Sequence, residues 1–254
     1  MPSNAPILEF DPAPRAILEP QPFPPTQPIP NRAVLCFFAE VLQHLIDEGR
    51  LQPAGALKSE IGLSPYYTLE INNQSILVTH PGVGAPLAAG FLEELIALGV
   101  NQFVACGGAG VLNARTHAGH AFVINSAVRD EGVSYHYLPA AREVQPSPRV
   151  TAALQASLEE HKVPYELVKT WTTDAIYRET ATKRDQRVAE GCEVVEMEAA
   201  AFFAVAQFRG VEFGQLLYGG DLVVAEGWDS RAWDQRQDSR SALFWLAVDA
   251  CTRL

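Results

Sequence analysis

The sequence predicts a single α/β domain, with a central mixed, mostly parallel sheet and helices on both of its faces. Short apolar runs alternate with helix-like segments over most of the chain, a pattern typical of sheets covered by helices. The 254 residues suffice for one sizeable core, and α/β domains of this size are often undivided. No internal repeat is evident. We therefore expect residues 33–254 to fold as one unit.

The first 32 residues differ in composition from the rest of the chain. Ten of the 18 prolines lie within the first 30 residues. Proline fixes φ and lacks a backbone donor, so residues 20–30 are expected to be extended or turn-like. Apolar residues such as Ile7, Phe10 and Phe23 interrupt this stretch. We predict that residues 1–32 form a proline-rich arm packed over the domain or a neighbouring subunit, a disordered tail being the alternative.

The remaining elements follow from hydrophobic periodicity. Residues 33–48 have apolar positions at helical spacing and end at Gly49, which predicts an amphipathic helix. Two apolar runs at 66–71 and 75–79 flank a polar turn and predict a hairpin. Further helices are expected over residues 86–98, 150–162, 180–190, 198–209 and 240–253. Further strands are expected over residues 102–106, 121–128, 165–170, 192–195 and 215–218.

Composition excludes several classes of protein. The net charge of -11 and the pI near 5.0 argue against nucleic acid and anionic membrane surfaces as partners. No run of 18 or more apolar residues occurs, and residues 1–4 lack the layout of a signal peptide, so we expect a cytoplasmic protein. The four cysteines show neither Cys-x-x-Cys spacing nor a nearby histidine pair. We expect no disulfide framework, no metal and no organic cofactor.

Two glutamates stand where an apolar strand meets an alanine-rich helix. Side chains at the carboxyl end of such a strand project into the crevice above the sheet. The carboxylates of Glu196 and Glu198 can each accept two hydrogen bonds, which suits a vicinal diol, and the Met197 thioether can lie under a sugar ring. This arrangement predicts a ribose site. The alternative is that both acids merely stabilise a helix N-terminus, by up to about 1 kcal/mol.

Two glycine segments follow predicted strands. Gly84 precedes a helix, so backbone N–H groups there are free to meet an anion or a sugar oxygen. Gly107 and Gly108 follow the next strand, where the absence of side chains would let a nucleobase and ribose lie against the backbone; the alternative is a close helix–strand contact. Neither segment matches a dinucleotide fingerprint or a Walker motif, so we expect no dinucleotide and no ATP.

An aspartate follows the apolar strand at 215–218. Asp221 is placed to hydrogen-bond or protonate a departing nucleobase. A general acid neutralises the negative charge that develops on that base and so lowers the activation free energy by roughly 2–5 kcal/mol. The alternative is a helix N-cap.

Several segments, taken in order, resemble the purine-nucleoside and uridine phosphorylase superfamily. The similarity runs from about Ile76 to the C-terminus. It rests on residues 82–86 with 93–99, on 106–112, on 128–132, and on Val-Glu-Met-Glu-Ala-Ala-Ala at 195–201 followed by Gly220 and Asp221. The resemblance implies a nucleoside phosphorylase-like fold. It also implies a pentosyltransferase that uses phosphate to split a purine or pyrimidine ribonucleoside into free base and ribose 1-phosphate.

The resemblance also implies roles for individual residues. Asp221 would assist base departure with an arginine, for which Arg231 is the first candidate and Arg236 the second. Tyr177 or Ile176 would stack on the base, and Arg178 either contacts the substrate or pairs with an acid on the surface. The family completes its sites with a neighbour's residues, so a homo-oligomer, either a dimer or a trimer of dimers, is expected.

The arginines with which the family holds phosphate have no clear counterparts here. The first loop would correspond to residues 18–22, which lack Gly-Asp-Pro, and a later arginine position falls near Ala105. Arg129 and Arg32 are the remaining candidates for phosphate as co-substrate, with Arg178 a third. Two alternatives stay open: a nucleoside hydrolase that uses water, with Glu19 as its possible base, and a nucleoside-binding protein without turnover.

Overall fold

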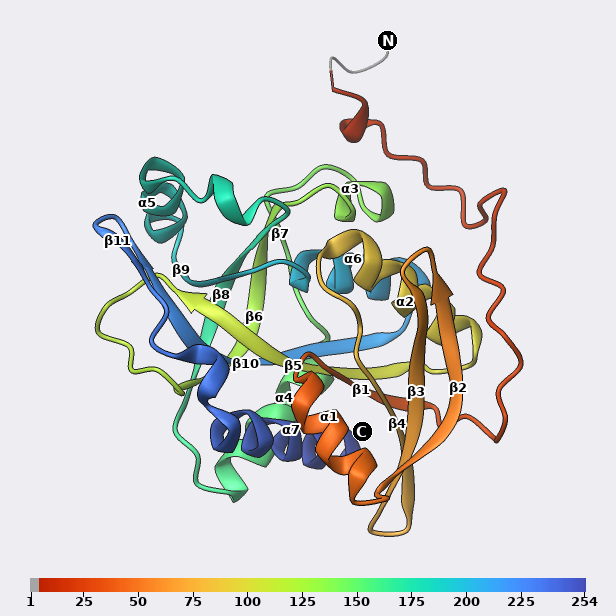
Figure 1. The fold of residues 1–254 in the computed structure, drawn as a ribbon. Helices are drawn as coiled ribbons and strands as arrows, with labels where there is room; N and C mark the ends of the chain where they lie inside the picture. The colour runs from red at the N-terminus through yellow and green to blue at the C-terminus, as the bar shows by residue number, and fades with distance from the viewer. Residues whose placement is uncertain (1–4) are drawn as a thin grey trace.

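Eleven strands of the computed structural model, which describes residues 5–254, join in one mixed sheet (Figure 1). The strands are β1 (Arg32–Cys36), β2 (Leu51–Ser59), β3 (Gly62–Ile71), β4 (Gln74–Thr79), β5 (Gln102–Val111), β6 (Ala121–Asp130), β7 (Glu143–Val144), β8 (Tyr165–Thr173), β9 (Cys192–Glu196), β10 (Glu212–Val224) and β11 (Gly227–Asp229). The helices are α1 (Ala39–Asp47), α2 (Ala85–Ala97), α3 (Ser134–Tyr137), α4 (Pro148–Glu160), α5 (Ala181–Ala189), α6 (Ala199–Arg209) and α7 (Gln237–Thr252).

Five of the strands close into a ring. β10 pairs with β5 in parallel and with β6 in antiparallel orientation. β6 and β9 each pair with β8 in parallel, and β9 returns to β5 in antiparallel orientation. From β5 the sheet continues outward through β1, β4, β3 and β2. The β11 strand, which pairs with β10, forms a short hairpin at the far side of the ring.

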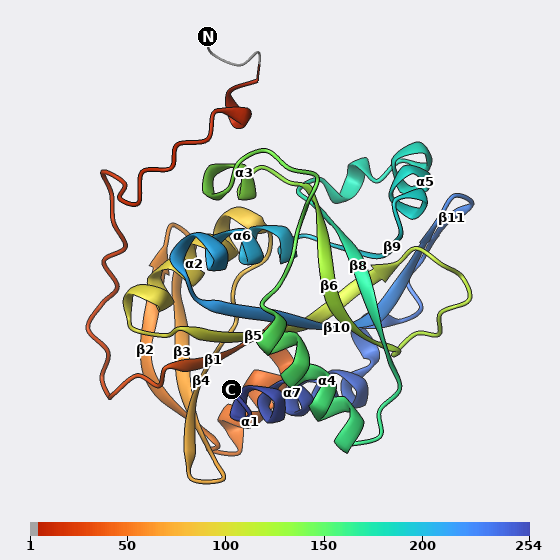
Figure 2. The same ribbon diagram turned by 180° about the vertical axis from the view of Figure 1, so that it is seen from behind.

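Helices cover both faces of the sheet, as the sequence predicted (Figure 2). Alternate residues of β1 point to opposite faces because the side chains of a strand alternate. Leu35 packs in a core with residues of α2 and α6. Val34 and Cys36 pack in a second core with residues of α1, α4 and α7. The expectation of one α/β domain on a mixed sheet is confirmed.

The predicted helix over residues 33–48 is wrong in its first part. Residues 33–36 belong to β1 and are almost fully buried, and α1 begins only at Ala39. A strand buried on both faces reads as a continuous apolar run, which periodicity cannot distinguish from a buried helix. Strand β2 was missed altogether, because its buried positions are interrupted by Pro53 and Gly55 at a register shift against β3.

Other local predictions are confirmed. The hairpin between β3 and β4 turns at Asn72 and Asn73, whose φ angles of 49° and 61° lie in the left-handed region that asparagine tolerates. Helix α6 ends at Gly210 with φ 69°. The expected helices near residues 86–98, 150–162, 180–190 and 240–253 correspond to α2, α4, α5 and α7.

Residues 5–31 run along the outside of the domain, with one 3-10 turn, η1 (Pro6–Leu8) (Figure 1). The arm is tied down at separate points: the backbone N–H of Thr26 donates to the Ala54 carbonyl, and the Arg209 guanidinium donates to the Pro14 carbonyl. Ile17 and Leu18 are exposed. Residues 1–4, on which the signal-peptide prediction rests, lie outside the described residues. Within residues 5–254, no helix is both long and apolar enough to cross a bilayer.

Candidate active site

A cavity of about 420 Å³ opens where β1 and β9 end and where β5 and β10 pass each other. Its apolar lining comes from Phe37, Phe38, Val83, Ile176, Val195, Met197, Leu217, Tyr218, Trp228 and Trp233. Its polar lining comes from Glu196, Glu198, Gln215, Asp221 and Arg240, together with the backbone of the β5 glycines. A mostly apolar cavity with a few converging polar groups is the usual form of a small-molecule site.

Glu196 is buried and its hydrogen bonds are fully used. Its Oε1 accepts from the hydroxyls of Thr170 and Thr172, at 3.1 and 2.6 Å. Its Oε2 accepts from the backbone N–H groups of Glu198 and Ala199, at 2.8 and 2.6 Å. These donors belong to β8 and to the start of α6, so this carboxylate ties the strand to the helix. Glu196 thus shapes the site and has few lone pairs left for a ligand.

Glu198 is the more available of the two acids. Its Oε1 accepts from the backbone N–H of Gly84 at 2.6 Å, and its Oε2 accepts more weakly from that of Met197 at 3.3 Å. Burial raises the pKa of Glu198, and the neighbouring charge of Glu196 raises it further. Gly84 is the N-cap of α2, and its φ of 87° is not helical. Its backbone N–H therefore points to the carboxylate. The two segments meet at one end of the cavity.

Gly107 and Gly108 do not form a loop as expected, because β5 continues through them to Val111. A Cβ at Gly108 would lie 3.1 Å from the Tyr218 ring, and one at Gly110 would lie 2.9 Å from the Val195 side chain. A side chain at either position would crowd these cavity residues. Gly108 lines the cavity, whereas Gly107 faces Phe37 and Leu217 behind its wall.

Asp221 also lines the cavity, and it lies within β10 rather than after it. The indole Nε1 of Trp228 donates to its Oδ2 at 2.6 Å. Glu179 stands close enough to be affected by its charge: burial, and then the charge of Asp221, raise the pKa of Glu179 to about 7. Asp221 therefore has an indole donor as its partner and a second carboxyl group, that of Glu179, within reach of its charge.

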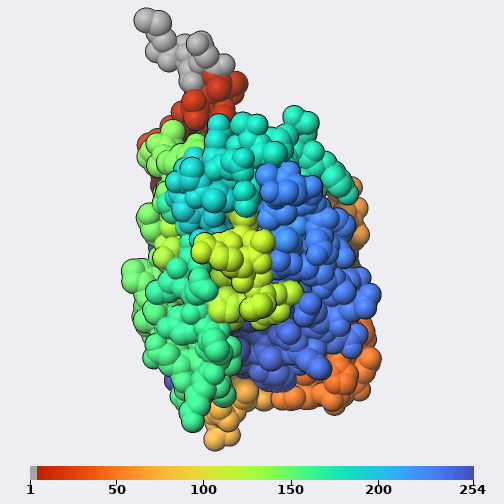
Figure 3. Space-filling model, turned by 90° about the vertical axis from the view of Figure 1, so that its left-hand side faces the viewer, coloured from red at the N-terminus to blue at the C-terminus, as the bar shows by residue number. Residues whose placement is uncertain are grey.

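The segment after β8 is arranged differently from the sequence expectation. Ile176 lines the cavity, whereas Tyr177 is 95% exposed and Arg178 is exposed beside it. The Arg231 guanidinium donates to the Thr116 carbonyl, and Arg231 does not belong to the lining. In Figure 3 this side of the molecule is formed by α5, β11 and the loop between β5 and β6, which lie against one another.

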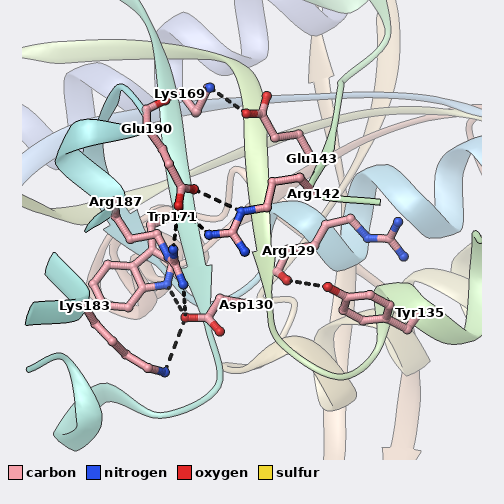
Figure 4. A network of polar contacts seen from close by, with 10 residues as sticks. All are labelled: Arg129, Asp130, Tyr135, Arg142, Glu143, Lys169, Trp171, Lys183, Arg187 and Glu190. Atoms are coloured by element: carbon pink, nitrogen blue, oxygen red, sulfur yellow. Dashed lines mark hydrogen bonds and ion pairs between the residues drawn. The ribbon is translucent and has the colours of Figure 1, made fainter. Parts of the chain in front are cut away.

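None of the three phosphate candidates, Arg32, Arg129 and Arg178, is among the residues that line the cavity. Arg32 lies at the amino end of β1, and its guanidinium donates to Gln74, Gln102 and the Thr252 carbonyl. The Arg129 guanidinium is buried against α3, where it donates to the Ser134 hydroxyl and to the carbonyls of Leu138 and Pro139. Figure 4 shows the backbone carbonyl of Arg129 accepting from the Tyr135 hydroxyl.

The residues that follow β1 line the cavity but were not among the predicted site residues. Phe37 and Phe38 form the cavity wall there, and the expected first loop at residues 18–22 belongs instead to the arm. Phe37 and Phe38 were not predicted because residues 33–48 were expected to form one helix. Arg240, in the first turn of α7, was missed as well because it lies 19 residues beyond Asp221.

Arg240 carries the only positive charge among the described residues that line the cavity. It is 7% exposed, its Nε lies 2.8 Å from Glu40 Oε1, and its guanidinium lies 4.7 Å from the Phe38 ring centre. Glu40 also lines a larger groove of about 630 Å³ between α1 and α7. The Glu40–Arg240 ion pair therefore neutralises the charge of Arg240. The pair also lies between the cavity and that groove.

A polar network fixes α5 beside the site (Figure 4). The buried Trp171 donates from Nε1 to Asp130 Oδ2 at 2.9 Å. Arg187, 5% exposed, donates to Asp130 at 3.2 Å and to Glu190 at 2.9 Å, and its guanidinium lies 5.6 Å from the Trp171 ring centre. The network joins β6, β8 and α5, and so it holds the segment that carries Ile176 and Glu179.

The fold and the cavity together define an α/β protein whose sheet carries a cavity lined by acids and apolar side chains. A model of the phosphorylase superfamily matches residues 31–247, and the chain belongs to this superfamily. A guanosine phosphorylase from Halorubrum lacusprofundi is 30% identical over 184 residues, which are 70% of this chain and 76% of that protein. The recognition made from the sequence motifs is confirmed.

Solved structures show the same fold. A uridine phosphorylase from Vibrio fischeri superposes with a TM-score of 0.73 at 19% identity, covering 89% of this chain and 93% of that one. An AMP nucleosidase from Bacteroides thetaiotaomicron superposes with a TM-score of 0.70 at 20% identity, covering 89% and 88%. At these identities the superpositions support the architecture alone.

Proposed function

We propose that this protein cleaves the N-glycosidic bond of a ribonucleoside through an oxocarbenium-like state. Glu198 would hold the ribose hydroxyls, with Glu196 fixing the strand–helix junction and Met197 lying against the sugar. Gly84 would orient the Glu198 carboxylate, and Gly108 would let the substrate lie against β5. Asp221 would give a proton to the departing base. The observation that carries the proposal is that two acids, Glu198 and Asp221, line one cavity.

The lining favours water over phosphate as the nucleophile. A phosphate dianion needs charge-assisted donors, each contributing roughly 1.5–3 kcal/mol. Arg240, the one cation that residues 5–254 contribute to the lining, is already paired with Glu40, and the end of β1 presents two phenyl rings. Water would add to C1′ while the base leaves, so that the products are free base and free ribose.

Phosphorolysis is the second candidate. It is favoured by the 30% identity to a guanosine phosphorylase over most of both chains. In that case Arg240 would have to exchange Glu40 for phosphate, and ribose 1-phosphate would be formed. Arg32 and Arg129, whose donors are occupied elsewhere, would take part only after a large rearrangement.

The test is a panel of inosine, adenosine, guanosine, uridine and thymidine, incubated with and without phosphate. Phosphate at roughly 50 mM saturates sites of ordinary millimolar or tighter affinity. Base release without phosphate, with free ribose as coproduct, supports hydrolysis. Release that requires phosphate and yields ribose 1-phosphate supports phosphorolysis. Tight binding of a nucleoside without release of base would make the chain a nucleoside-binding protein and overturn the proposed activity.

A further inference from the structure

The indole of Trp228 contacts the proposed acid at the mouth of the cavity. Trp228 is 65% exposed, and its Nε1 donates to Oδ2 of Asp221 at 2.6 Å. The register of the hairpin explains this contact. Val223 pairs with Trp228 across the antiparallel strands β10 and β11, and Asp221 precedes Val223 by two residues. Residues two apart share one face of a strand, so the indole lies diagonally opposite the carboxyl group.

The chemistry of the two groups is asymmetric. An indole N–H can only donate, whereas a neutral carboxylic acid has one oxygen that carries the proton and one that accepts. Because Trp228 donates to Oδ2, this oxygen is occupied as an acceptor, and Oδ1 is the oxygen left to carry the proton when Asp221 takes one up. Oδ1 lies 3.6 Å from the position of a Cβ on Gly110, and Gly110 lines the cavity. The proton-bearing oxygen therefore faces the ligand space.

We propose that Trp228 is a positioning residue that assigns the proton of Asp221 to Oδ1 and covers the departing base. This inference rests on the proposed function. In the step, the electrons of the C1′–N bond pass to the base, and the Oδ1–H bond breaks as the base takes that proton. Water adds to C1′ and releases a proton to solvent, from which Asp221 is reprotonated. Trp228 keeps its hydrogen bond to Oδ2 throughout.

Two titratable groups face Asp221 from other positions. Glu179 approaches from the segment before α5, and Tyr218 from β10 itself. Both become negative when they lose a proton, so they act on Asp221 through charge. Trp228 carries no charge and acts through direction alone. Removing its N–H should therefore change the rate of proton transfer more than the affinity for the nucleoside.

The test separates the N–H from the ring. Trp228→Phe keeps an aromatic cover and removes the donor, whereas Trp228→Gln keeps a donor and removes the ring. With a nucleoside that the wild type cleaves, Trp228→Phe should lower kcat at least about tenfold and leave KM within about threefold, since a positioned acid contributes about 10²–10⁴ in rate. Trp228→Gln should recover most of kcat and raise KM. Trp245→Phe, on α7 against Arg50, is the matched control for loss of an indole.

A wild-type kcat in Trp228→Phe would overturn the proposal, as would equal losses of kcat in the two variants. The contact itself is tested without turnover by the indole ¹H–¹⁵N resonance of Trp228, identified by its loss in Trp228→Phe. It should shift in Asp221→Asn, because an amide oxygen accepts more weakly than a carboxyl group that can ionise. An unmoved resonance would overturn the contact, whereas a wild type that cleaves no nucleoside would overturn the proposed function and the catalytic step built on it.

Discussion

The Oε1 atom of Glu198 lies 2.6 Å from the backbone nitrogen of Gly84, although 114 residues separate the two in the chain. The contact joins the start of α6 to the start of α2, and it holds a buried carboxylate that has one further, weak backbone donor in Met197. A carboxylate that is buried and only partly satisfied is well suited to bind hydroxyl groups of a ligand.

Glu198→Gln should therefore weaken the nucleoside site without unfolding the protein. The amide keeps an acceptor for Gly84 but cannot ionise, whereas Glu198, whose pKa is raised to about 8, becomes a carboxylate above that pH. Hydrogen bonds to a charged group contribute about 1.5–3 kcal/mol. Above pH 8 we expect kcat/KM to fall by roughly 10–150-fold, measured as initial rates at low nucleoside concentration. Burial raises the pKa of Glu198, so the neutral amide should not lower Tm. A kcat/KM within twofold of wild type would contradict the assigned role.

Asp221→Asn should separate turnover from affinity. The amide still accepts from the Trp228 indole but has no proton to give, and loss of a general acid costs about 10²–10⁴ in rate. Nucleoside affinity, measured by calorimetry, should stay within a few-fold. Equal turnover in wild type and variant would remove Asp221 from the mechanism.

Glu179 should make stability depend on pH in a definite window. Its pKa is raised in the folded state to about 7, so the folded protein binds its proton more tightly than the unfolded chain does. Stability is then lost as pH rises from the ordinary glutamate range to about 7, and the loss is complete above that. Glu179→Gln should abolish this loss.

The measurement is Tm for wild type and Glu179→Gln across this pH range. Because Glu179 is partly exposed, the gain of the variant near pH 8 should be only about 1 kcal/mol, or roughly 2–4 °C. The two proteins should have equal Tm near pH 4. A constant difference at all pH values would show that packing, rather than the proton, causes the effect.

Asp130→Ala should destabilise the fold more than most surface changes. The substitution leaves the buried Trp171 N–H without its acceptor and removes one of two carboxylates from the buried Arg187. Breaking a buried pair costs about 3–5 kcal/mol when nothing compensates, and the remaining Glu190 partner places the expectation near the lower end. Denaturant unfolding measures the change. Arg253→Gln, which breaks a more exposed pair with Asp249 and Glu160, should cost at most about 1 kcal/mol.

The sequence predicted the elements whose pattern is local. Helices such as α2 and α4 have clear apolar faces, and the Asn72–Asn73 turn sets the β3–β4 hairpin through conformations that asparagine tolerates. Strand β1 was misread because burial on both faces erases the alternation that marks a strand. Because of the same error, the first loop was expected at residues 18–22, in the arm, and Phe37 and Phe38 were not predicted to line the cavity.

The lining of the cavity could be predicted where a short motif carries it and not where it depends on three-dimensional packing. Glu196, Met197, Glu198 and Asp221 all line one cavity, together with Gly108. Arg240 and Trp228 line the same cavity. Arg240 is placed by the start of α7 and Trp228 by the register between β11 and β10, and no local sequence pattern predicts either placement. Whether Tyr177 or Ile176 faced the cavity depended on the 3-10 turn at 176–178, which turns Tyr177 outward.

The closed ring of strands also has a consequence for biosynthesis. Within residues 5–254, β10 is the one strand that pairs with both β5 and β6, and it occupies residues 212–224, near the end of the chain. During translation, β5 and β6 leave the ribosome long before the strand that pairs with both. Until then each has an unpaired edge, which invites pairing with another chain. A nascent or truncated chain that stops before residue 212 should therefore depend on chaperones far more than the finished protein does.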